Sequence, residues 1–284
     1  MLLLFENVVS GEELYIPLIS TGTSNDNITF TVSWGDGRGT QTFTRNADVS
    51  NLLDSNIVKH TYTSAQANLT VSVTVTSVAS GQGVAWNGIN SGNGDRNRLS
   101  VGMYAKLVEV SATVGSSGLD PQWGLKNLTH LTGSFFKAVK LTKVPDAMPN
   151  TVISTAHAFR DAIIFNQNLA YTIPSGFSGA GYYGWDMSNV TTADNMFNNA
   201  KAFNNGNLQS TDINNWNVSK VKDMTSMFKD ATVFNQPIGN WDVSSVTNMF
   251  EMFYDAEAFN QDITRWNTSK VTNMNSMFFN AGAF

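Results

Sequence analysis

The sequence predicts a mainly β protein with short helical arms, in which an N-terminal β-sandwich is followed by a solenoid of stacked repeats. Trp216, Trp241 and Trp266 recur at intervals of 25 residues, and the text between them repeats as well; such a period is typical of a solenoid. The segment Leu69–Val78 (LTVSVTVTSV) alternates apolar and polar residues, as a half-buried strand does. Only 14% of the residues are charged, and Asn, Thr, Ser and Gly supply much of the remaining polarity, which favours strands and turns over long exposed helices.

Residues 1–80 are expected to form the sandwich. Leu2–Phe5 is interpreted as its first strand, because the apolar stretch is short and no basic residue precedes it, so no secretion signal is recognisable. Ile28–Gly37 alternates and then breaks at a Gly-Asp-Gly turn. In Leu69–Val78, the side chains of Leu69, Val71, Val73 and Val75 fall on one face and Thr and Ser side chains on the other.

Three further segments follow. Residues 81–100 are rich in Gly, Asn and Ser without periodicity and are expected to be a linker. Residues 101–184 are interpreted as degenerate capping repeats that carry an insertion, and residues 185–284 as regular 25-residue repeats. The last residue, Phe284, occupies the position of Phe234 and Phe259, so the array is cut in mid-repeat. We expect the natural chain to continue past Phe284, or another molecule to cover this end.

Each repeat is expected to combine a helical arm with a short strand. From Val246 to Phe259 the apolar residues step by three or four, which predicts an α- or 3₁₀-helical arm, and Phe259–Trp266 is expected to be extended. Equivalent bulky residues of neighbouring units should stack as a structural ladder in the core, while asparagines at the turn satisfy backbone groups. The ladder comprises Trp216, Trp241, Trp266, Phe228, Phe253 and Phe278, with Asn235 and Asn260 at the turn.

Two sets of motifs resemble known families. Val32–Gly37 (VSWGDG), followed by His60-Thr61-Tyr62 and an alternating strand, resembles the PKD-like immunoglobulin-type fold. The resemblance implies that these two strings pack near one another and that His60 is structural. The phrase W-D/N-V-S-x-V-T-x-M-x-x-M-F-x-x-A-x-x-F-N-Q-x-I resembles the BspA-like leucine-rich-repeat surface proteins, specifically over residues 185–284 and more weakly over 101–184. The fold implied is a PKD-like β-sandwich followed by a leucine-rich-repeat solenoid.

The same resemblance implies a function. It predicts a non-enzymatic adhesin or recognition protein, extracellular or at the cell surface, whose solenoid binds a protein or glycan on another cell or particle. Family members usually carry a secretion or lipoprotein signal, which is not recognisable here. The alternative is therefore a structural virion or appendage protein, a decoration or fibre at the virion surface, whose repeats pack against neighbouring subunits in a homo-oligomer or particle.

Several function classes lose support from composition. The net charge of −5 without clustered Lys or Arg gives no support for nucleic-acid binding, and no apolar run is long enough to span a membrane. The absence of cysteine excludes thiolate catalysis and Cys-ligated zinc. The three histidines are far apart in sequence, and no pair of carboxylates stands out as a glycosidase pair. We expect no catalytic residue and no cofactor.

Ligand contacts are expected at positions that vary between repeats, because the constant positions build the core. On the extended segment Asp262 and Thr264 replace Pro237 and Gly239, and on the arm Ser226, Glu251 and Ser276 also vary. The inserted loop adds aromatic candidates, for which packing against the array is an equal alternative. Calcium is considered only in the oxygen-rich loop near residue 93, where the position-12 Glu of an EF-hand is missing and a plain turn is the alternative. The loop aromatics are Tyr171, Phe177, Tyr182 and Tyr183, and the calcium candidates are Asn93 and Asp95.

Overall fold

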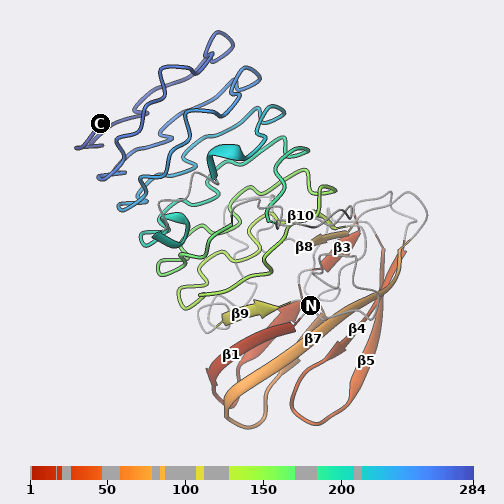
Figure 1. Cartoon of the computed structure of the whole chain (residues 1–284). Coiled ribbons are helices and arrows are strands. Elements are labelled where there is room, and N and C mark those ends of the chain that lie inside the picture. Colours follow the sequence, from red (N-terminus) through yellow and green to blue (C-terminus); the bar gives the residue numbers. More distant parts are fainter. Residues whose placement is uncertain are drawn as a thin grey trace, which may run out of the picture.

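The computed structural model describes residues 2–16, 18–20, 27–46, 58–78, 84–86, 107–111, 128–169, 184–207 and 213–284. These residues are mainly β with almost no helix, as the composition predicted. The helices they contain are two 3₁₀ segments of three residues, η3 (Asn205–Asn207) and η4 (Ile213–Asn215). Figure 1 shows the strands gathered at the N-terminal end and a stack of chain turns that leads to the C-terminus.

The strands of the described residues form three sheets. The largest has the order β5-β4-β7-β1-β9, and each of its pairs is antiparallel. A second pairs β2 with β6, and in a third β8 lies between β3 and β10, parallel to β10. The strands are β1 (Leu2–Val8), β2 (Glu13–Ile16), β3 (Leu18–Ser20), β4 (Asn27–Ser33), β5 (Thr40–Asn46), β6 (Val58–Thr61), β7 (Gln66–Val78), β8 (Val84–Trp86), β9 (Leu107–Ser111) and β10 (Leu128–His130).

Strand β7 shows why this sheet forms. Leu69, Val71, Val73 and Val75 are buried, whereas Thr70 and Thr74 between them are exposed, so the alternation in the sequence gives one dry face and one wet face. The expected first strand is confirmed as β1, which lies beside β7 in the sheet. Of the expected linker, residues 84–86 are described, and they form β8. Leu107–Ser111, which was expected to belong to the capping repeats, forms β9 and pairs with β1 in the largest sheet.

The two strings near Trp34 and His60 meet in the structure. The indole of Trp34 stacks on the imidazole of His60 with ring centroids 4.9 Å apart, and His60 Nε2 lies 2.8 Å from Asp36 Oδ2. The Tyr62 hydroxyl donates to the Trp34 carbonyl at 3.1 Å; burial, together with the negative charge of Asp36, raises the pKa of Tyr62. Burial raises the pKa of Asp36, but hydrogen bonds from the Arg38 amide and from His60 outweigh it and hold that pKa below its usual value.

The Asp36 carboxylate should make stability depend on pH. A carboxyl group whose pKa is lower in the folded than in the unfolded chain stabilises the fold above its unfolded pKa of about 3.9, and this contribution is lost as pH falls through the folded value. We expect the difference in unfolding free energy between the wild type and Asp36→Asn to be largest at neutral pH and to shrink below about pH 4 in urea titrations. A difference that stays constant with pH would contradict a role for the Asp36 charge.

The stack of chain turns is joined by a ladder of parallel bridges. It begins at His130 in β10 and continues unit by unit through single residues. Because β10 also pairs with β8, backbone hydrogen bonding runs from the third sheet into the stack. The bridged residues are His130, Ser154, Thr192, Asp223, Asn248 and Asn273.

The predicted helical arm is wrong: the segment is a series of tight turns. Ser226 and Asp230 have φ angles of 51° and 57°, which end any right-handed helix. Every second amide donates to the next unit instead of along its own chain. Amides between them close four-residue turns, such as Met227 to the carbonyl of Met224. The amides of Met224, Ser226, Phe228 and Asp230 donate to the carbonyls of Asn248, Phe250, Met252 and Tyr254 at 3.0, 2.8, 2.9 and 2.8 Å.

The strand expected at Phe259–Trp266 is also wrong. This segment forms no strand pairing; it contains a turn at Thr264 and Arg265, and the Trp266 amide donates to the Ile263 carbonyl at 3.1 Å. The bridges between units lie instead just before each turn series, at Asn248 and its equivalents.

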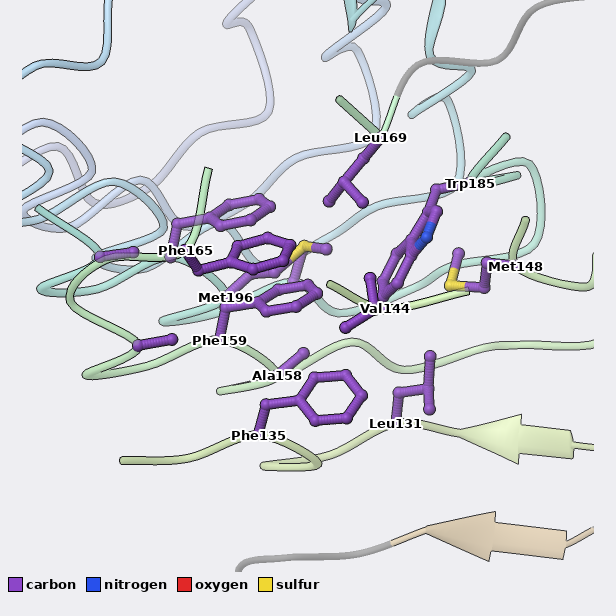
Figure 2. Close-up of a cluster of buried hydrophobic side chains, with 14 of the residues drawn as sticks. Leu131, Phe135, Val144, Met148, Ala158, Phe159, Phe165, Leu169, Trp185 and Met196 are labelled. Carbon is purple, nitrogen blue, oxygen red and sulfur yellow. The ribbon is translucent and has the colours of Figure 1, made fainter. Parts of the chain in front are cut away.

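Stacked phenylalanine rings fill the interior of the units. Phe159 lies 5.3 Å from Phe197, and Phe228 lies 5.7 Å from Phe253, with each pair of rings nearly parallel. Figure 2 shows the N-terminal part of this core, where Phe159 packs against Phe135, Phe165 and Trp185. The buried side chains from Leu3 in β1 to Met277 near the C-terminus belong to one continuous cluster, so the sheets and the units share a core.

Among the residues that the structure places, no helix has the length and apolar character needed to cross a membrane.

Candidate functional site

The turn series of successive units form one face of the stack, which we call the turn face: residues 131–138, 155–162, 193–200, 224–231, 249–256 and 274–281. A groove of about 490 Å³ crosses it and takes residues from four successive units. Such a volume lies within the range of small-molecule sites. The groove is lined by Arg160, Asp161, Asn195, Asn198, Asn199, Lys201, Ser226, Lys229, Asp230 and Glu251.

Backbone conformation determines which side chains reach the groove. Each unit has two residues with positive φ, four positions apart, on either side of the core phenylalanine. In the regular units these are Ser226 and Asp230, then Glu251 and Asp255. Asn, Asp and Ser suit such positions because a short polar side chain tolerates the left-handed region better than a bulky one.

The residue that follows each core phenylalanine supplies a further row along the groove, which we call the outer row. It consists of Phe136, Arg160, Asn198, Lys229, Tyr254 and Phe279. Lys229 Nζ lies 2.6 Å from Glu251 Oε2 and 4.3 Å from the centre of the Tyr254 ring, and Tyr254 stacks on Phe279 at 4.8 Å. The outer row is therefore cationic and amide-bearing at the groove and aromatic beyond it.

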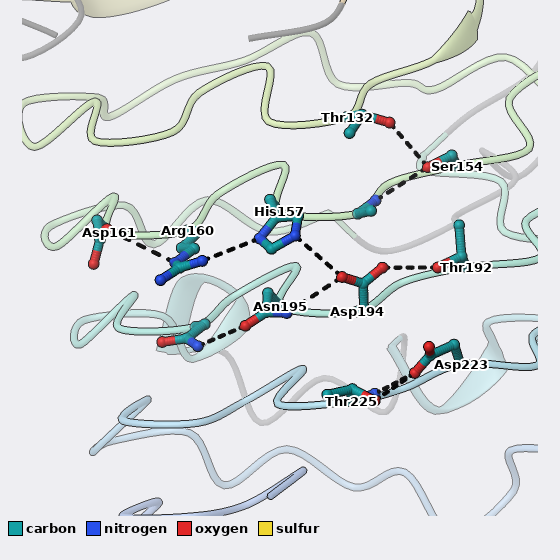
Figure 3. Close-up of polar contacts among 12 residues, drawn as sticks. Thr132, Ser154, His157, Arg160, Asp161, Thr192, Asp194, Asn195, Asp223 and Thr225 are labelled. Carbon is teal, nitrogen blue, oxygen red and sulfur yellow. Dashed lines mark hydrogen bonds and ion pairs between the residues drawn. The ribbon is translucent and has the colours of Figure 1, made fainter. Parts of the chain in front are cut away.

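A polar network supports the N-terminal end of the groove (Figure 3). His157 Nε2 lies 3.2 Å from Asp194 Oδ2, and Arg160 lies 3.4 Å from His157 Nδ1. Asp194 also accepts hydrogen bonds from Thr192 at 2.8 Å and Asn195 at 3.2 Å. Burial raises the pKa of Asp194, but the hydrogen bonds from His157 and Thr192 outweigh it, so the pKa is below its usual value. The network keeps Asp194 ionised and holds Arg160 and Asn195 in place.

The charges of the groove balance. Arg160, Lys201 and Lys229 stand against Asp161, Asp230 and Glu251. Burial and the neighbouring carboxylate of Asp255 raise the pKa of Asp230.

The groove is rich in hydrogen-bonding groups. Its amides, hydroxyl, carboxylates and cationic groups present donors and acceptors side by side. Within the described ranges no group of three or more His, Cys, Asp or Glu is arranged to hold a metal ion.

The sequence of the region that contains the groove also identifies the protein family. A sequence profile described as "Mycoplasma protein of unknown function, DUF285" matches residues 104–211 and 175–284, which together cover more than half of the chain. The chain belongs to the DUF285 family. No curated protein and no experimentally determined structure matches it. The DUF285 matches contain every residue that lines the groove.

The ladder residues of the DUF285 repeats lie in the core or at the turns. Trp216 and Trp241 stack at 6.1 Å, and Trp266 packs against Phe253 at 6.4 Å; Phe253 also stacks on the partly buried Phe278 at 5.6 Å. The Asn235 side-chain oxygen accepts hydrogen bonds from the Asn260 amide at 3.0 Å and from Gln261 at 2.8 Å. Each asparagine thus links one unit to the next.

The ligand contacts predicted from the sequence are not brought together with the groove. Asp262 accepts hydrogen bonds from the amide and hydroxyl of Thr264 at 2.9 and 2.7 Å, which makes a local turn, and both residues are exposed away from the groove lining. Those hydrogen bonds hold the pKa of Asp262 below its usual value. Tyr171, Phe177, Tyr182, Tyr183, Asn93 and Asp95 lie outside the described residues.

The sequence interpretation missed most of the groove of this DUF285 protein. Ser226 and Glu251 were recognised as variable positions, but the outer row was not, although Arg160, Asn198 and Lys229 differ at one repeat position. Aligning the residue that follows each core phenylalanine is the signal that finds it.

Proposed function

We propose that this DUF285 protein is a non-enzymatic recognition protein, an adhesin that acts outside the cell or at its surface. In this proposal residues 1–80 form a PKD-like immunoglobulin-type sandwich. Residues 101–284, apart from β9 (Leu107–Ser111), which pairs with β1 in the largest sheet, form a leucine-rich-repeat solenoid, with capping repeats at its start, that binds a protein or glycan.

The contacts between units support a solenoid. Parallel bridges, stacked rings and shared asparagines each connect a unit to its immediate neighbour, which is how repeat proteins gain stability. The contact between Trp34 and His60 supports the sandwich assignment, because it joins the two strings that carry the PKD-like resemblance.

The groove on the turn face carries the functional proposal. Its framework is fixed by a dry core and by hydrogen bonds that repeat from unit to unit, whereas its lining changes at each step along the outer row. A rigid frame that presents varied side chains suits selective binding, since little conformational entropy is lost when the ligand binds.

The test is a binding measurement with a matched pair of variants. The double variant Arg160→Ser and Lys229→Ser removes two cationic side chains from the groove; Lys222→Ser and Lys270→Ser removes two exposed lysines elsewhere. Biolayer interferometry against extracellular-matrix glycoproteins and intact cells should show binding by the wild type and the control. The affinity of the groove variant should be lower by at least about ten-fold.

Two outcomes would contradict the proposal. Equal binding by both double variants would place the interaction away from the groove. Self-assembly in size-exclusion chromatography without binding to any panel member would favour the alternative of a structural virion or appendage protein. Circular dichroism and thermal melts verify that both variants fold.

A further inference from the structure

We propose that the ligand of the turn-face groove is a neutral, linear oligosaccharide. This inference rests on the proposed function and narrows it from protein or glycan to one class of glycan. Charge, hydrogen-bonding chemistry and the geometry of the units each point to it.

The charge pattern favours a ligand without net charge. Lys229 is already paired with Glu251 at 2.6 Å, and Arg160 Nε lies 4.0 Å from Asp161 Oδ2. Lys201 and Lys229 also lie close enough to Asp230 to oppose the rise in its pKa. A sulfated or sialylated glycan, or an acidic peptide, would meet carboxylates next to every cation, and like-charge contacts of this kind disfavour binding.

The polar groups of the groove suit sugar hydroxyls. Asn195, Asn198 and Asn199 come from one unit, and the next unit adds Ser226 beside them. Each amide offers both a donor and an acceptor, as does a hydroxyl, so neighbouring hydroxyls of one sugar can satisfy both. The internal bonds from Asn198 to Asn195 at 2.8 Å and from Asn199 to Asp161 at 2.7 Å fix the orientation of these amides.

The same lining argues against a protein partner at this site. Every residue that lines the groove is polar, whereas protein interfaces draw most of their affinity from aromatic or arginine anchors seated in desolvated pockets. An open groove with a mainly polar lining offers such an anchor little apolar contact.

The repeat geometry argues for a linear chain. Arg160, Asn198 and Lys229 occupy one position in three successive units, and the parallel bridges between units set a step of about 4.8 Å. A ligand made of repeating sugars can place one residue after another along this row, so its affinity should increase with chain length until the groove is filled.

The experiment compares Asn199→Asp with Asn280→Asp. Both asparagines occupy the second positive-φ position of their unit, and each donates its side-chain amide to an aspartate of the preceding unit, Asp161 at 2.7 Å and Asp255 at 2.6 Å. Only Asn199 lines the groove. The substitution therefore removes the same donor and adds the same charge in both proteins, but only one change lies at the proposed site.

The probes are neutral linear oligosaccharides of glucose, galactose and N-acetylglucosamine, sulfated and sialylated oligosaccharides, and deglycosylated matrix proteins. A glycan microarray followed by titration calorimetry should show binding of a neutral oligosaccharide by the wild type. Asn199→Asp should weaken this binding by at least about ten-fold, and Asn280→Asp should leave it within about two-fold. The affinity should also change little with ionic strength, because no ion pair with the ligand is screened.

Other results separate the two proposals. Binding only of charged oligosaccharides overturns the neutral ligand. Binding only of deglycosylated protein overturns the glycan ligand but leaves a recognition protein, and binding of no probe overturns the neutral glycan as well. Should Asn199→Asp fail to fold, Lys201→Ser changes an exposed side chain of the same groove, and unchanged binding by a folded groove variant overturns the site.

Discussion

Replacing Phe228 by alanine should lower the free energy of unfolding by about 3–5 kcal/mol, the range for removing a buried aromatic ring. Phe228 is fully buried and lies at the centre of the ring stack, 5.6 Å from Phe197 and 5.7 Å from Phe253. Phe234 of its own unit stacks at 3.9 Å. Because backbone hydrogen bonds hold the units at a fixed spacing, the surrounding structure cannot collapse into the cavity.

The matched control is Phe279→Ala, which removes the same ring from a position that is 57% exposed. Its effect should stay below about 1 kcal/mol. Chemical denaturation followed by tryptophan fluorescence measures both. Similar losses in the two variants would mean that the stacked interior is not the main source of stability.

Replacing Gly35 by alanine should destabilise the N-terminal sheets by about 3 kcal/mol or more. Gly35 has a φ of 78°, and a Cβ atom there would lie 2.2 Å from the carbonyl oxygen of Thr70 in β7. That oxygen belongs to the backbone of a central strand, so it cannot move aside without breaking the sheet.

Gly37→Ala separates the cost of the positive φ angle from the cost of the clash with the Thr70 carbonyl oxygen. Gly37 has a similar φ of 84°, but nothing lies within 4 Å of a Cβ placed there. It should therefore show only the cost of the left-handed conformation, about 1 kcal/mol. Equal thermal shifts for the two variants would indicate that the contact with Thr70 is unimportant.

The sequence predicted the structure best where a single spacing of apolar residues determines which side chains are buried. The alternation in Leu69–Val78 predicted a strand with one buried face, and the structure has that strand as β7. The recurrence of Trp241 and Phe253 every 25 residues marks positions that meet their equivalents in space, because each unit is in contact with the next.

The helical arm was wrong because two structures share its periodicity. Apolar residues spaced by three or four, as at Met249, Met252, Phe253 and Ala256, fit a helix and also fit consecutive turns that return to the core. What separates them is the destination of the amide groups, half of which bond to the next unit. The helix or strand propensities of one unit contain no information about the carbonyl groups of the next unit, which accept these hydrogen bonds.

The groove could be predicted only in part, since variation between repeats marks the surface positions but not how they combine. Asn198 and Asn199 lie in one unit and Glu251 two units further along. Their grouping depends on positive-φ residues such as Ser226, and therefore on the turn structure that the periodicity concealed.

The units differ in length, but the distance between stacked rings in the interior is nearly the same. Phe159 and Phe197 are 197 − 159 = 38 residues apart and stack at 5.3 Å, whereas Phe228 and Phe253 are 253 − 228 = 25 apart and stack at 5.7 Å. Extra sequence can thus enter between two rings while the ring spacing is kept. A longer or foreign sequence placed between two ring positions should therefore leave the spacing of the stacked rings unchanged.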